Sequence, residues 1–418
     1  MEPTSTPAAR QETLRRHNLG LVLRQVLEAA VPPSRADVAA RTGLTRATVS
    51  ALVDRLVEAG MVAELPPVAS RRAGRPGVPL APARGTFAAI GLEVNVSYLG
   101  VRALDLAGEV LTARVEVHDL HRSSPDAVLD LLASLTVEVL EELTAKRTRV
   151  LGAGIALPGL VDRATGTLRL APNLGWHDVE LAEVLARAPF ASMEVVELGN
   201  EASLAAWAEA RAHPGARPSF LYVSGEVGIG GGVVHHGEVF QGQRGWSGEL
   251  GHTTVEPDGP ACACGSRGCL EGYAGRAAIM TTAGLDPLTP VDELLTRLAG
   301  GSVPARRSLE RAGWALGVAL ANAVNLLDID GVRLGGFYAP LTDTLAAPVQ
   351  DQLGRRVLST PWSRPTVHRA VSGQHAAMTG AALSVLRRLV ADPTAWGAGT
   401  VLPTAESSVS TTTDVPAR

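Results

Sequence analysis

The three cysteines of this 418-residue chain lie within eight consecutive positions, and no other feature of the sequence constrains the local fold so strongly. A histidine precedes the first cysteine by ten positions. Three thiolates and one imidazole complete the four-coordinate shell of structural Zn²⁺ and leave no open position for catalysis. Gly265 and Gly268 allow the tight turns that bring three sulfurs together. We therefore predict a structural zinc loop over 252–269, rather than three unrelated buried thiols, with the ligands His252, Cys262, Cys264 and Cys269.

Charge is unevenly distributed along the chain. Residues 1–85 hold twelve Arg and seven acidic residues, a net charge of +5, whereas 86–418 hold 26 basic and 35 acidic residues, a net charge of −9. The formal total of −4 describes neither part. A basic first fifth on an acidic body indicates an appended nucleic-acid-binding module.

Three further observations concern the cellular compartment in which the protein is expected. Three cysteines are too few for a disulfide-stapled secreted scaffold. No run of about 18 apolar residues exists that would span a membrane. The first eleven residues lack the apolar core of a signal peptide. We expect a cytoplasmic protein with no membrane partner.

Residues 13–59 carry the pattern of a helix-turn-helix module. Apolar residues at helical spacing predict a first helix over 13–29. Ser34 is placed to cap a second helix that ends at residue 42, and Thr45 to cap a third that ends at residue 59. A glycine-containing turn joins these two helices, as in DNA-binding modules of this type.

Two short strands, 61–65 and 78–81, follow the third helix and flank a basic wing at 70–76. The exposed start of the third helix is where a recognition helix meets base edges and phosphates, and an extended arginine in a wing can enter the minor groove. We predict a winged helix-turn-helix domain over 13–82; the alternative is a small protein-interaction module. The candidate DNA contacts are Arg35, Thr45, Arg46, Thr48, Ser50, Arg71, Arg72 and Arg75.

The remainder of the chain predicts an α/β body over 86–390. Strand patterns at 86–94, 97–104 and 109–117 are followed by an amphipathic helix over 124–146 and a strand at 150–156. A related order recurs from residue 220, with strands at 220–224 and 230–235 and near 239, a helix over 308–328 and a strand at 331–334. Two such lobes suggest an actin-like ATPase fold with a cleft between them. The polar segment 394–418 is predicted to be a disordered tail.

One segment resembles a known family. The run Gly248-Glu249-Leu250-Gly251-His252, with the cysteine cluster and Leu270-Glu271-Gly272 behind it, is similar to the zinc and sugar region of the ROK family of bacterial sugar kinases and sugar-responsive repressors. The resemblance extends over about 13–390, through 158–159, 173–176, 200–203, 228–232 and 334–336. It implies a homodimer or homotetramer, and a sugar pocket built from Gly159, Asn200, Glu201, Glu249, His252 and Glu271.

The kinase motifs of that family are altered in this chain. Its kinases carry Asp-x-Gly-Gly-Thr where this sequence has Glu93-Val94-Asn95-Val96-Ser97, and Gly-Thr-Gly where it has Glu226-Val227-Gly228. Glu201 stands at the position of the catalytic Asp. Side chains in place of glycines block close backbone approach to phosphate, and Glu226 brings negative charge to the second phosphate segment.

These changes predict a protein that is not an enzyme. We expect a sugar-responsive transcriptional regulator, and a repressor rather than an activator, that binds double-stranded operator DNA. The first alternative is an ATP-dependent sugar kinase with a DNA-binding domain. The second is a regulator whose signal is a partner protein.

Overall fold

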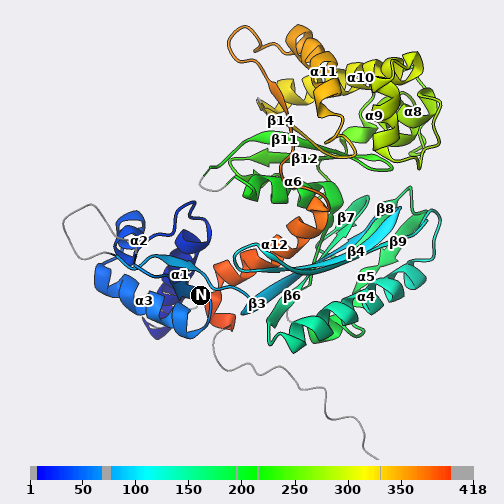
Figure 1. Ribbon diagram of the computed structural model, residues 1–418. Helices are drawn as coiled ribbons and strands as arrows, with labels where there is room; N and C mark the ends of the chain where they lie inside the picture. The colour runs from blue at the N-terminus through cyan, green and yellow to red at the C-terminus, as the bar shows by residue number, and fades with distance from the viewer. Residues whose placement is uncertain (1–6, 68–76, 194–195, 214–215, 330, 397–418) are drawn as a thin grey trace, which may run out of the picture.

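The computed structural model of this protein describes residues 7–67, 77–193, 196–213, 216–329 and 331–396. A small N-terminal module lies beside the first of two α/β lobes, and the second lobe follows on the far side of two central helices (Figure 1). The predicted fold class, a winged helix-turn-helix joined to a two-lobed actin-like α/β body, is confirmed.

The N-terminal module folds from the signals that the sequence predicts. It consists of α1 (Pro7–Leu27), α2 (Arg35–Thr42), α3 (Arg46–Glu58), β1 (Val62–Glu64) and β2 (Leu80–Pro82), the two strands being antiparallel. The Ser34 side chain and the Asp37 carboxylate cap each other's backbone N–H groups at the start of α2. The Thr45 hydroxyl accepts from Thr48 N at the start of α3. The whole of the predicted wing 70–76, including Arg71, Arg72 and Arg75, lies outside the described residues.

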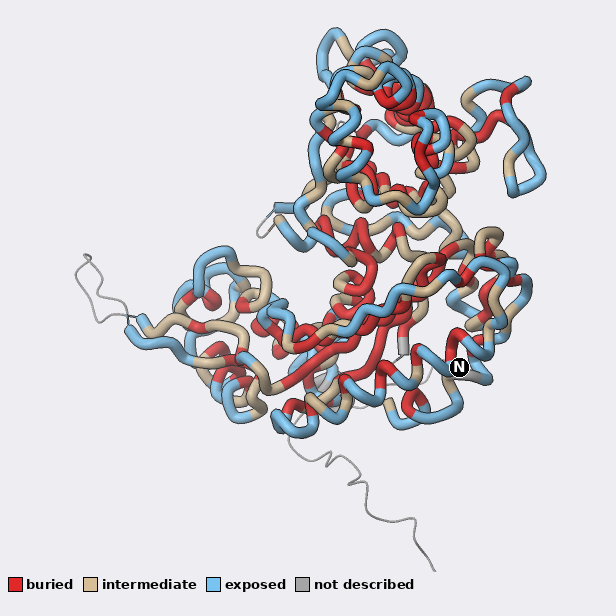
Figure 2. Tube along the Cα trace, turned by 45° about the vertical axis from the view of Figure 1, so that its right-hand side comes forward, coloured by how far each residue is buried: buried red, intermediate tan, exposed pale blue. Residues whose placement is uncertain are grey.

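The first lobe is built on a five-stranded sheet of order β10-β6-β3-β4-β5. Buried residues of β3, β4 and β6 pack with those of the helix that follows the sheet's edge strand to form the core of the lobe, and the buried path of the chain is coloured red in Figure 2. The expected strands and helix are present as β3 (Phe87–Val94), β4 (Tyr98–Asp105), β5 (Val110–Val117), α4 (Pro125–Ala145) and β6 (Arg149–Leu157). Further elements that were not predicted are β7 (Leu160–Asp162), β8 (Thr167–Ala171), β9 (Trp176–Glu180), α5 (Leu181–Leu185) and β10 (Val196–Asn200).

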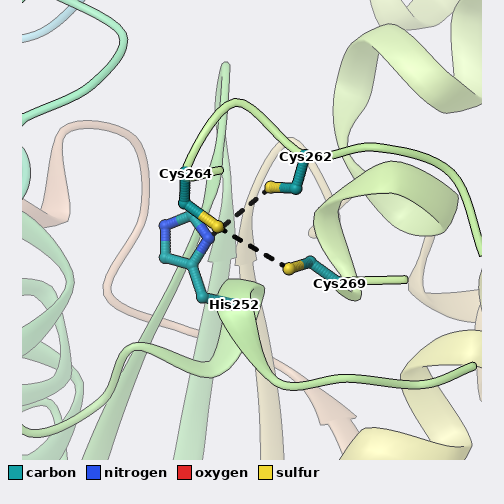
Figure 3. A group of neighbouring side chains, drawn as sticks. All are labelled: His252, Cys262, Cys264 and Cys269. Atoms are coloured by element: carbon teal, nitrogen blue, oxygen red, sulfur yellow. Dashed lines mark hydrogen bonds between the residues drawn. The ribbon is translucent and has the colours of Figure 1, made fainter. Parts of the chain in front are cut away.

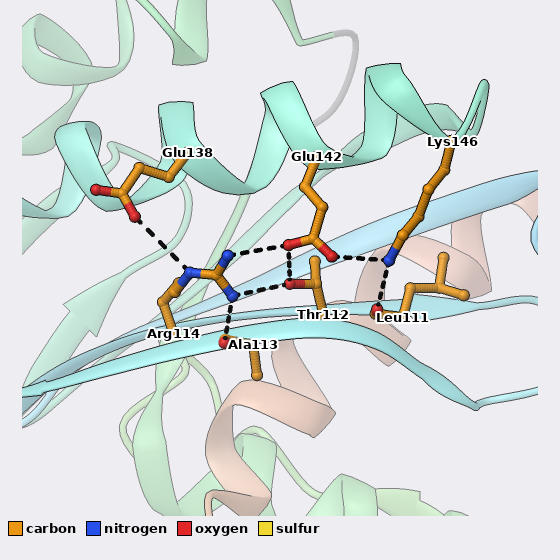
Figure 4. Close-up of polar contacts among 7 residues, drawn as sticks. All are labelled: Leu111, Thr112, Ala113, Arg114, Glu138, Glu142 and Lys146. Carbon is orange, nitrogen blue, oxygen red and sulfur yellow. Dashed lines mark hydrogen bonds and ion pairs between the residues drawn. The ribbon is translucent and has the colours of Figure 1, made fainter.

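Helix α4 is fastened to the edge strand β5 by a polar network centred on Glu142 (Figure 4). Its carboxylate accepts from Lys146 Nζ at 2.7 Å, from the Thr112 hydroxyl at 2.6 Å and from Arg114 at 3.0 Å. The hydrogen bond from Lys146, followed by that from Thr112, lowers the pKa of Glu142 to about 2. Lys146 also donates to the Leu111 carbonyl oxygen, so the one lysine of the sequence holds the end of α4 to the sheet.

The second lobe has a sheet of order β13-β12-β11-β14-β15, in which β11, β14 and β15 are parallel. A buried apolar cluster lies between this sheet and the outer helices. The elements are β11 (Phe220–Gly225), β12 (Ile229–His235), β13 (Glu238–Val239), α7 (Glu271–Ala274), α8 (Arg276–Thr282), α9 (Val291–Ala299), α10 (Val303–Leu327), β14 (Gly331–Gly336), α11 (Thr342–Arg356) and β15 (Thr366–Arg369).

Two helices, α6 (Glu201–Arg211) and α12 (Ala376–Ala391), pack against each other between the two sheets (Figure 1). Glycines make this packing close. A Cβ at Gly91 of β3 would overlap the Met378 carbonyl oxygen, and one at Gly380 would overlap the Leu204 carbonyl oxygen. Helix α12 thus lies on the first-lobe sheet, while α6 lies on the second.

The N-terminal module shares its hydrophobic core with the first lobe. One cluster joins α1, through Leu19, Val22, Leu23 and Val26, to residues of β3, β4, β6 and α12 and to Trp396. The connection between the module and the first lobe is therefore held by packed residues, Leu80 and Ala83 both being buried. The first residues of the predicted tail 394–418 belong to the 3₁₀ helix Pro393–Trp396, in which Trp396 is 5% exposed, and the rest of that segment lies outside the described residues.

Candidate functional site

The four predicted metal ligands converge at one point (Figure 3). One ligand atom from each of His252, Cys262, Cys264 and Cys269 lies within 4.8 Å of all the others. Cys262 Sγ is 3.8 Å from His252 Nδ1, and Cys264 Sγ is 3.8 Å from Cys269 Sγ. A tetrahedron with Zn–S bonds of about 2.3 Å has edges of about 3.8 Å. The donor set and its spacing therefore fit a zinc ion held by these side chains.

The loop reaches this geometry through two turns with positive φ. Gly265 has φ +91° and Gly268 has φ +67°, which are values that favour glycine. A side chain at Gly268 would also overlap the Glu256 carbonyl oxygen. The structure thus confirms the prediction that Gly265 and Gly268 allow tight turns in this loop. They leave Cys269 fully buried beside the start of α7 and Cys264 exposed.

A cavity with about 960 Å³ of empty space, including its open mouth, lies between the lobes beside the cysteine cluster. All six residues that the resemblance assigned to a sugar pocket line it: Gly159, Asn200, Glu201, Glu249, His252 and Glu271. They come from four separate places in the chain, so only the tertiary structure brings them together. Asn95, Asn173 and Glu226 line the same cavity. Asn173 lies in the segment 173–176, which was matched to the family, but no role was assigned to this residue. Its polar side chain, two positions before a glycine, was the signal that could have indicated a place in the site.

Two of the lining residues hold the walls of the cavity in place. Asn200 caps α6, since its Oδ1 accepts from the Ala202 and Ser203 amides, and its Nδ2 donates to the Gly159 carbonyl oxygen at 3.0 Å. Glu271 Oε2 accepts from Ile229 N at 3.1 Å and joins α7 to β12. Because His252 Nδ1 faces the cysteine sulfurs, Nε2 is the nitrogen left for another contact.

Three carboxyl groups from different elements influence one another beside this cavity. Burial, and next the charge of Glu93, raise the pKa of Glu201 well above its ordinary value. The same two causes raise the pKa of Glu226 to about 7. Burial also raises the pKa of Glu93 to about 7. The Oε2 atoms of Glu93 and Glu201 are buried and have no hydrogen-bond partner among the described residues.

The loop after β3 is closed by its own side chains. Asn95 Oδ1 accepts from the backbone amide and the hydroxyl of Ser97. Glu93 Oε1 accepts from the Tyr98 hydroxyl at 2.7 Å. Asn95 and Val96 are 2% and 4% exposed, so side chains occupy the space that glycines would leave for a ligand.

Two protein families match parts of this chain. Residues 89–388 match the ROK family, and residues 21–73 match the MarR family. The chain belongs to the ROK family. This ROK protein is 29% identical over 332 residues to the xylose repressor of Bacillus spizizenii, a match that covers 78% of this chain and 83% of the repressor.

The proteins similar to this chain include a kinase as well as a transcriptional regulator. A glucokinase of Streptomyces coelicolor is 30% identical over 317 residues, which covers 70% of this chain and 96% of the kinase. A solved structure of a ROK family transcriptional regulator, described as a homolog of the E. coli MLC protein, is 25% identical with a TM-score of 0.74 and covers 91% of this chain and 97% of that one. No helix in the described part of this ROK protein is long and apolar enough to cross a membrane.

The candidate DNA-contacting residues divide into two groups. Thr45, Arg46 and Thr48 are exposed at the start of α3, and Ser50 is half-buried. Arg35 differs from them, because its guanidinium lies 2.7 Å from Asp54 and 2.8 Å from Glu64 and also donates to the Ser50 carbonyl oxygen. These partners tie α2 to α3 and β1, which gives Arg35 a structural role that the linear sequence did not reveal.

Proposed function

We propose that this ROK protein is a sugar-responsive transcriptional repressor. In this proposal α3 and the wing bind double-stranded operator DNA, and the cavity between the lobes binds a sugar. The observation that carries the proposal is the combination, in one chain, of an exposed recognition-helix start with a cavity lined by carboxylates and amides that suit hydroxyl groups. The similarity to proteins named xylose repressor supports it.

The same cavity argues against phosphotransfer. Glu226 lines it at the second phosphate segment, and the side chains of Asn95 and Val96 fill the first. Glu201, at the position of the catalytic Asp, extends one methylene farther and is held towards its protonated form by burial. A shift of about 1 Å in a catalytic group can cost a hundredfold in rate. We propose that the protein is not a kinase.

We propose that the four clustered side chains hold a structural Zn²⁺. When bound, the metal supplies a cross-link between the 3₁₀ helix Leu250–His252 and the start of α7. His252 lines the cavity, so ligation through Nδ1 orients its ring and leaves Nε2 for a sugar hydroxyl.

Helix α12 offers a direct path from the cavity to the DNA-binding module. Glu93, whose charge acts on both Glu201 and Glu226, holds the Tyr98 hydroxyl. The Tyr98 ring lies edge-on to His375 at a centroid distance of 5.2 Å, and His375 directly precedes α12. The far end of α12 packs on α1. A sugar that prefers one arrangement of the lobes would thereby bias the position of the module.

A repressor of this kind acts in the cytoplasm as a homodimer or homotetramer. Two copies of α3 related by a two-fold axis would meet two half-sites of a palindromic operator. We propose this assembly because a single recognition helix reads too few base pairs for a specific operator.

The test starts from an operator selected by the purified protein from random duplex DNA. A panel of xylose, glucose, N-acetylglucosamine and N-acetylmannosamine is screened by thermal shift, and each hit is added to the operator-binding assay. A hit that weakens operator binding supports the proposal. If none of the sugars changes operator affinity and pull-downs recover a protein partner, the signal is that partner. ADP release with any sugar of the panel would instead favour the kinase alternative.

Arg46→Ala should weaken operator binding by about 1–3 kcal/mol, or about 5- to 150-fold, if Arg46 contacts a base. The reason is that Arg46 is exposed at the first position of α3. Fluorescence anisotropy with labelled operator measures the effect. Arg24→Ala, which removes an exposed arginine of α1, is the matched control. Equal affinities of the two variants would contradict a recognition role for Arg46.

Gly20→Ala should uncouple sugar binding from DNA binding. A Cβ at Gly20 would lie 2.5 Å from the Val390 carbonyl oxygen, so α1 must move away from α12. Coupled sites typically change each other's affinity about 5- to 150-fold, and we expect that factor to fall towards one. Operator affinity is measured with and without the sugar. Gly354→Ala, where a Cβ meets no atom within 4 Å, is the control. Unchanged coupling in Gly20→Ala would exclude this contact as the link.

A further inference from the structure

We infer that the cavity takes an unphosphorylated sugar, neutral or carrying a free amino group, and rejects the phosphate ester of the same sugar. The inference rests on the proposed function, since it specifies the ligand of the same cavity. It follows from the balance of donors, acceptors and charges in the cavity wall, and it narrows the effector to one chemical class.

The charged groups of the wall are almost all acidic. Carboxylates from four elements line the cavity, and no arginine or lysine is among the described residues that do so. They are Glu201, Glu226, Glu249 and Glu271. The single imidazole, His252, has one nitrogen directed at the cysteine sulfurs. A phosphate ester carries about two negative charges at neutral pH and is normally met by arginine, lysine or free backbone amides.

Several backbone amides that could replace such side chains already donate to other groups. The first turn of α6 faces the cavity at Asn200, but Asn200 Oδ1 occupies its Ala202 and Ser203 amides. The Ile229 amide donates to Glu271 Oε2, and the Glu226 amide donates to the Gly228 carbonyl oxygen. In the loop after β3, the Ser97 amide is taken by Asn95. The helix terminus and the loops that bind phosphate in other proteins therefore have no free donor at these positions.

The two arginines that act electrostatically on this acidic group are held by other partners. Arg276, which acts electrostatically on Glu226, donates to the carbonyl oxygens of Leu288 and Thr289 and lies over the Phe337 ring. Arg102, beside Glu93, donates to the Thr379 hydroxyl at 2.9 Å. Neither residue lines the cavity. A phosphate in the cavity would have no cation to pair with there.

The unpartnered carboxylate oxygens point to the group that the cavity does accept. Glu201 Oε2 and Glu93 Oε2 are both buried, and neither has a hydrogen-bond partner among the described residues; Glu93 as a whole is 3% exposed. Burial, and next the charge of Glu93, raise the pKa of both the Glu201 and the Glu226 carboxyl. A hydroxyl or ammonium donor relieves this arrangement, whereas a phosphate adds a further negative charge to it.

The experiment compares matched pairs by isothermal titration calorimetry on the full chain. The pairs are glucose with glucose 6-phosphate, N-acetylglucosamine with N-acetylglucosamine 6-phosphate, and mannose with mannose 6-phosphate; glucosamine is added as the amino sugar. For each sugar that binds, we expect its phosphate to bind at least about a hundredfold more weakly. Glu226→Gln should narrow this ratio by about tenfold, because it removes one charge without changing the shape of the side chain. Glu293→Gln, an exposed carboxylate on α9, should leave the ratio unchanged.

The outcomes separate this inference from the function on which it rests. A phosphate ester that binds as tightly as its parent sugar overturns the inference. If that ester also releases the operator DNA, the proposed function as a regulator is still supported. If the wild type binds the sugar much more tightly than its phosphate, and Glu226→Gln shows the same ratio of affinities, then Glu226 is not the residue that excludes the phosphate. If no sugar and no ester binds, the sugar-responsive function and the inference are both wrong.

Discussion

Cys269→Ser is expected to abolish metal binding by the purified protein. The zinc content should fall from about one ion per chain to near zero, because three ligands do not hold a structural site closed. Cys269 is fully buried and its Sγ lies 3.8 Å from Cys264 Sγ. Structural zinc sites contribute about 10–16 kcal/mol of apparent binding energy in small peptides, so the local effect is large even where the rest of the fold persists.

The loss of the metal should also weaken sugar binding in the cavity. His252 sits in both the metal cluster and the cavity wall, and Glu249 and Glu271 flank the same loop. Metal analysis of the purified variant, thermal unfolding and sugar titration measure the three consequences. Ser266→Ala replaces an exposed side chain between the cysteines and is the matched control. Full zinc content in Cys269→Ser would show that the cluster is not the metal site.

Glu209→Ala is expected to lower the free energy of unfolding by about 3–5 kcal/mol. The Glu209 carboxylate is fully buried, and its Oε2 accepts from the Val371 and Ser372 amides at 2.8 Å each. Its Oε1 lies 3.3 Å from His213 Nε2 and 3.8 Å from Arg333 Nε. Alanine would remove the acceptor of these donors, two of which belong to half-buried side chains, His213 and Arg333, and the segment that leads into α12 would lose its anchor on α6.

Urea unfolding of three variants tests this expectation. Glu209→Gln keeps one acceptor oxygen but removes the charge, so it should fall between the wild type and Glu209→Ala. Glu238→Ala removes a carboxylate that is 65% exposed and only 4.0 Å from Arg387, and should stay within about 0.5 kcal/mol of the wild type. A Glu209→Ala protein as stable as Glu238→Ala would mean that other acceptors or water replace the carboxylate.

Much of the fold could be predicted from short stretches of sequence. The caps at Ser34 and Thr45 and the helix α4 follow from side chains within one or two turns of the backbone they satisfy. The convergence of the cysteine cluster likewise depends on spacing and on two glycine turns within eight residues. Helix α12 was not predicted, although most of its residues are buried in the structure.

The partners of single side chains could not be predicted in the same way. Arg35 had the composition and position of a DNA contact, yet the fold places two carboxylates against it, Asp54 and Glu64. The structure of residues 394–396 was not predicted for the same reason. Trp396 stands in a segment of low sequence complexity, but α1 and β6 provide an apolar surface that buries it.

The sequence by itself determined the family, the winged helix-turn-helix and the set of residues able to bind a metal, because each depends on local spacing and side-chain chemistry. The tertiary structure alone decided two other properties. It joined α1 to α12 in a shared core, which makes the DNA-binding module part of the first lobe. It also brought Glu93, Glu201 and Glu226 from three elements into one electrostatic group beside the cavity. Both depend on contacts between residues more than a hundred positions apart, which no local pattern encodes.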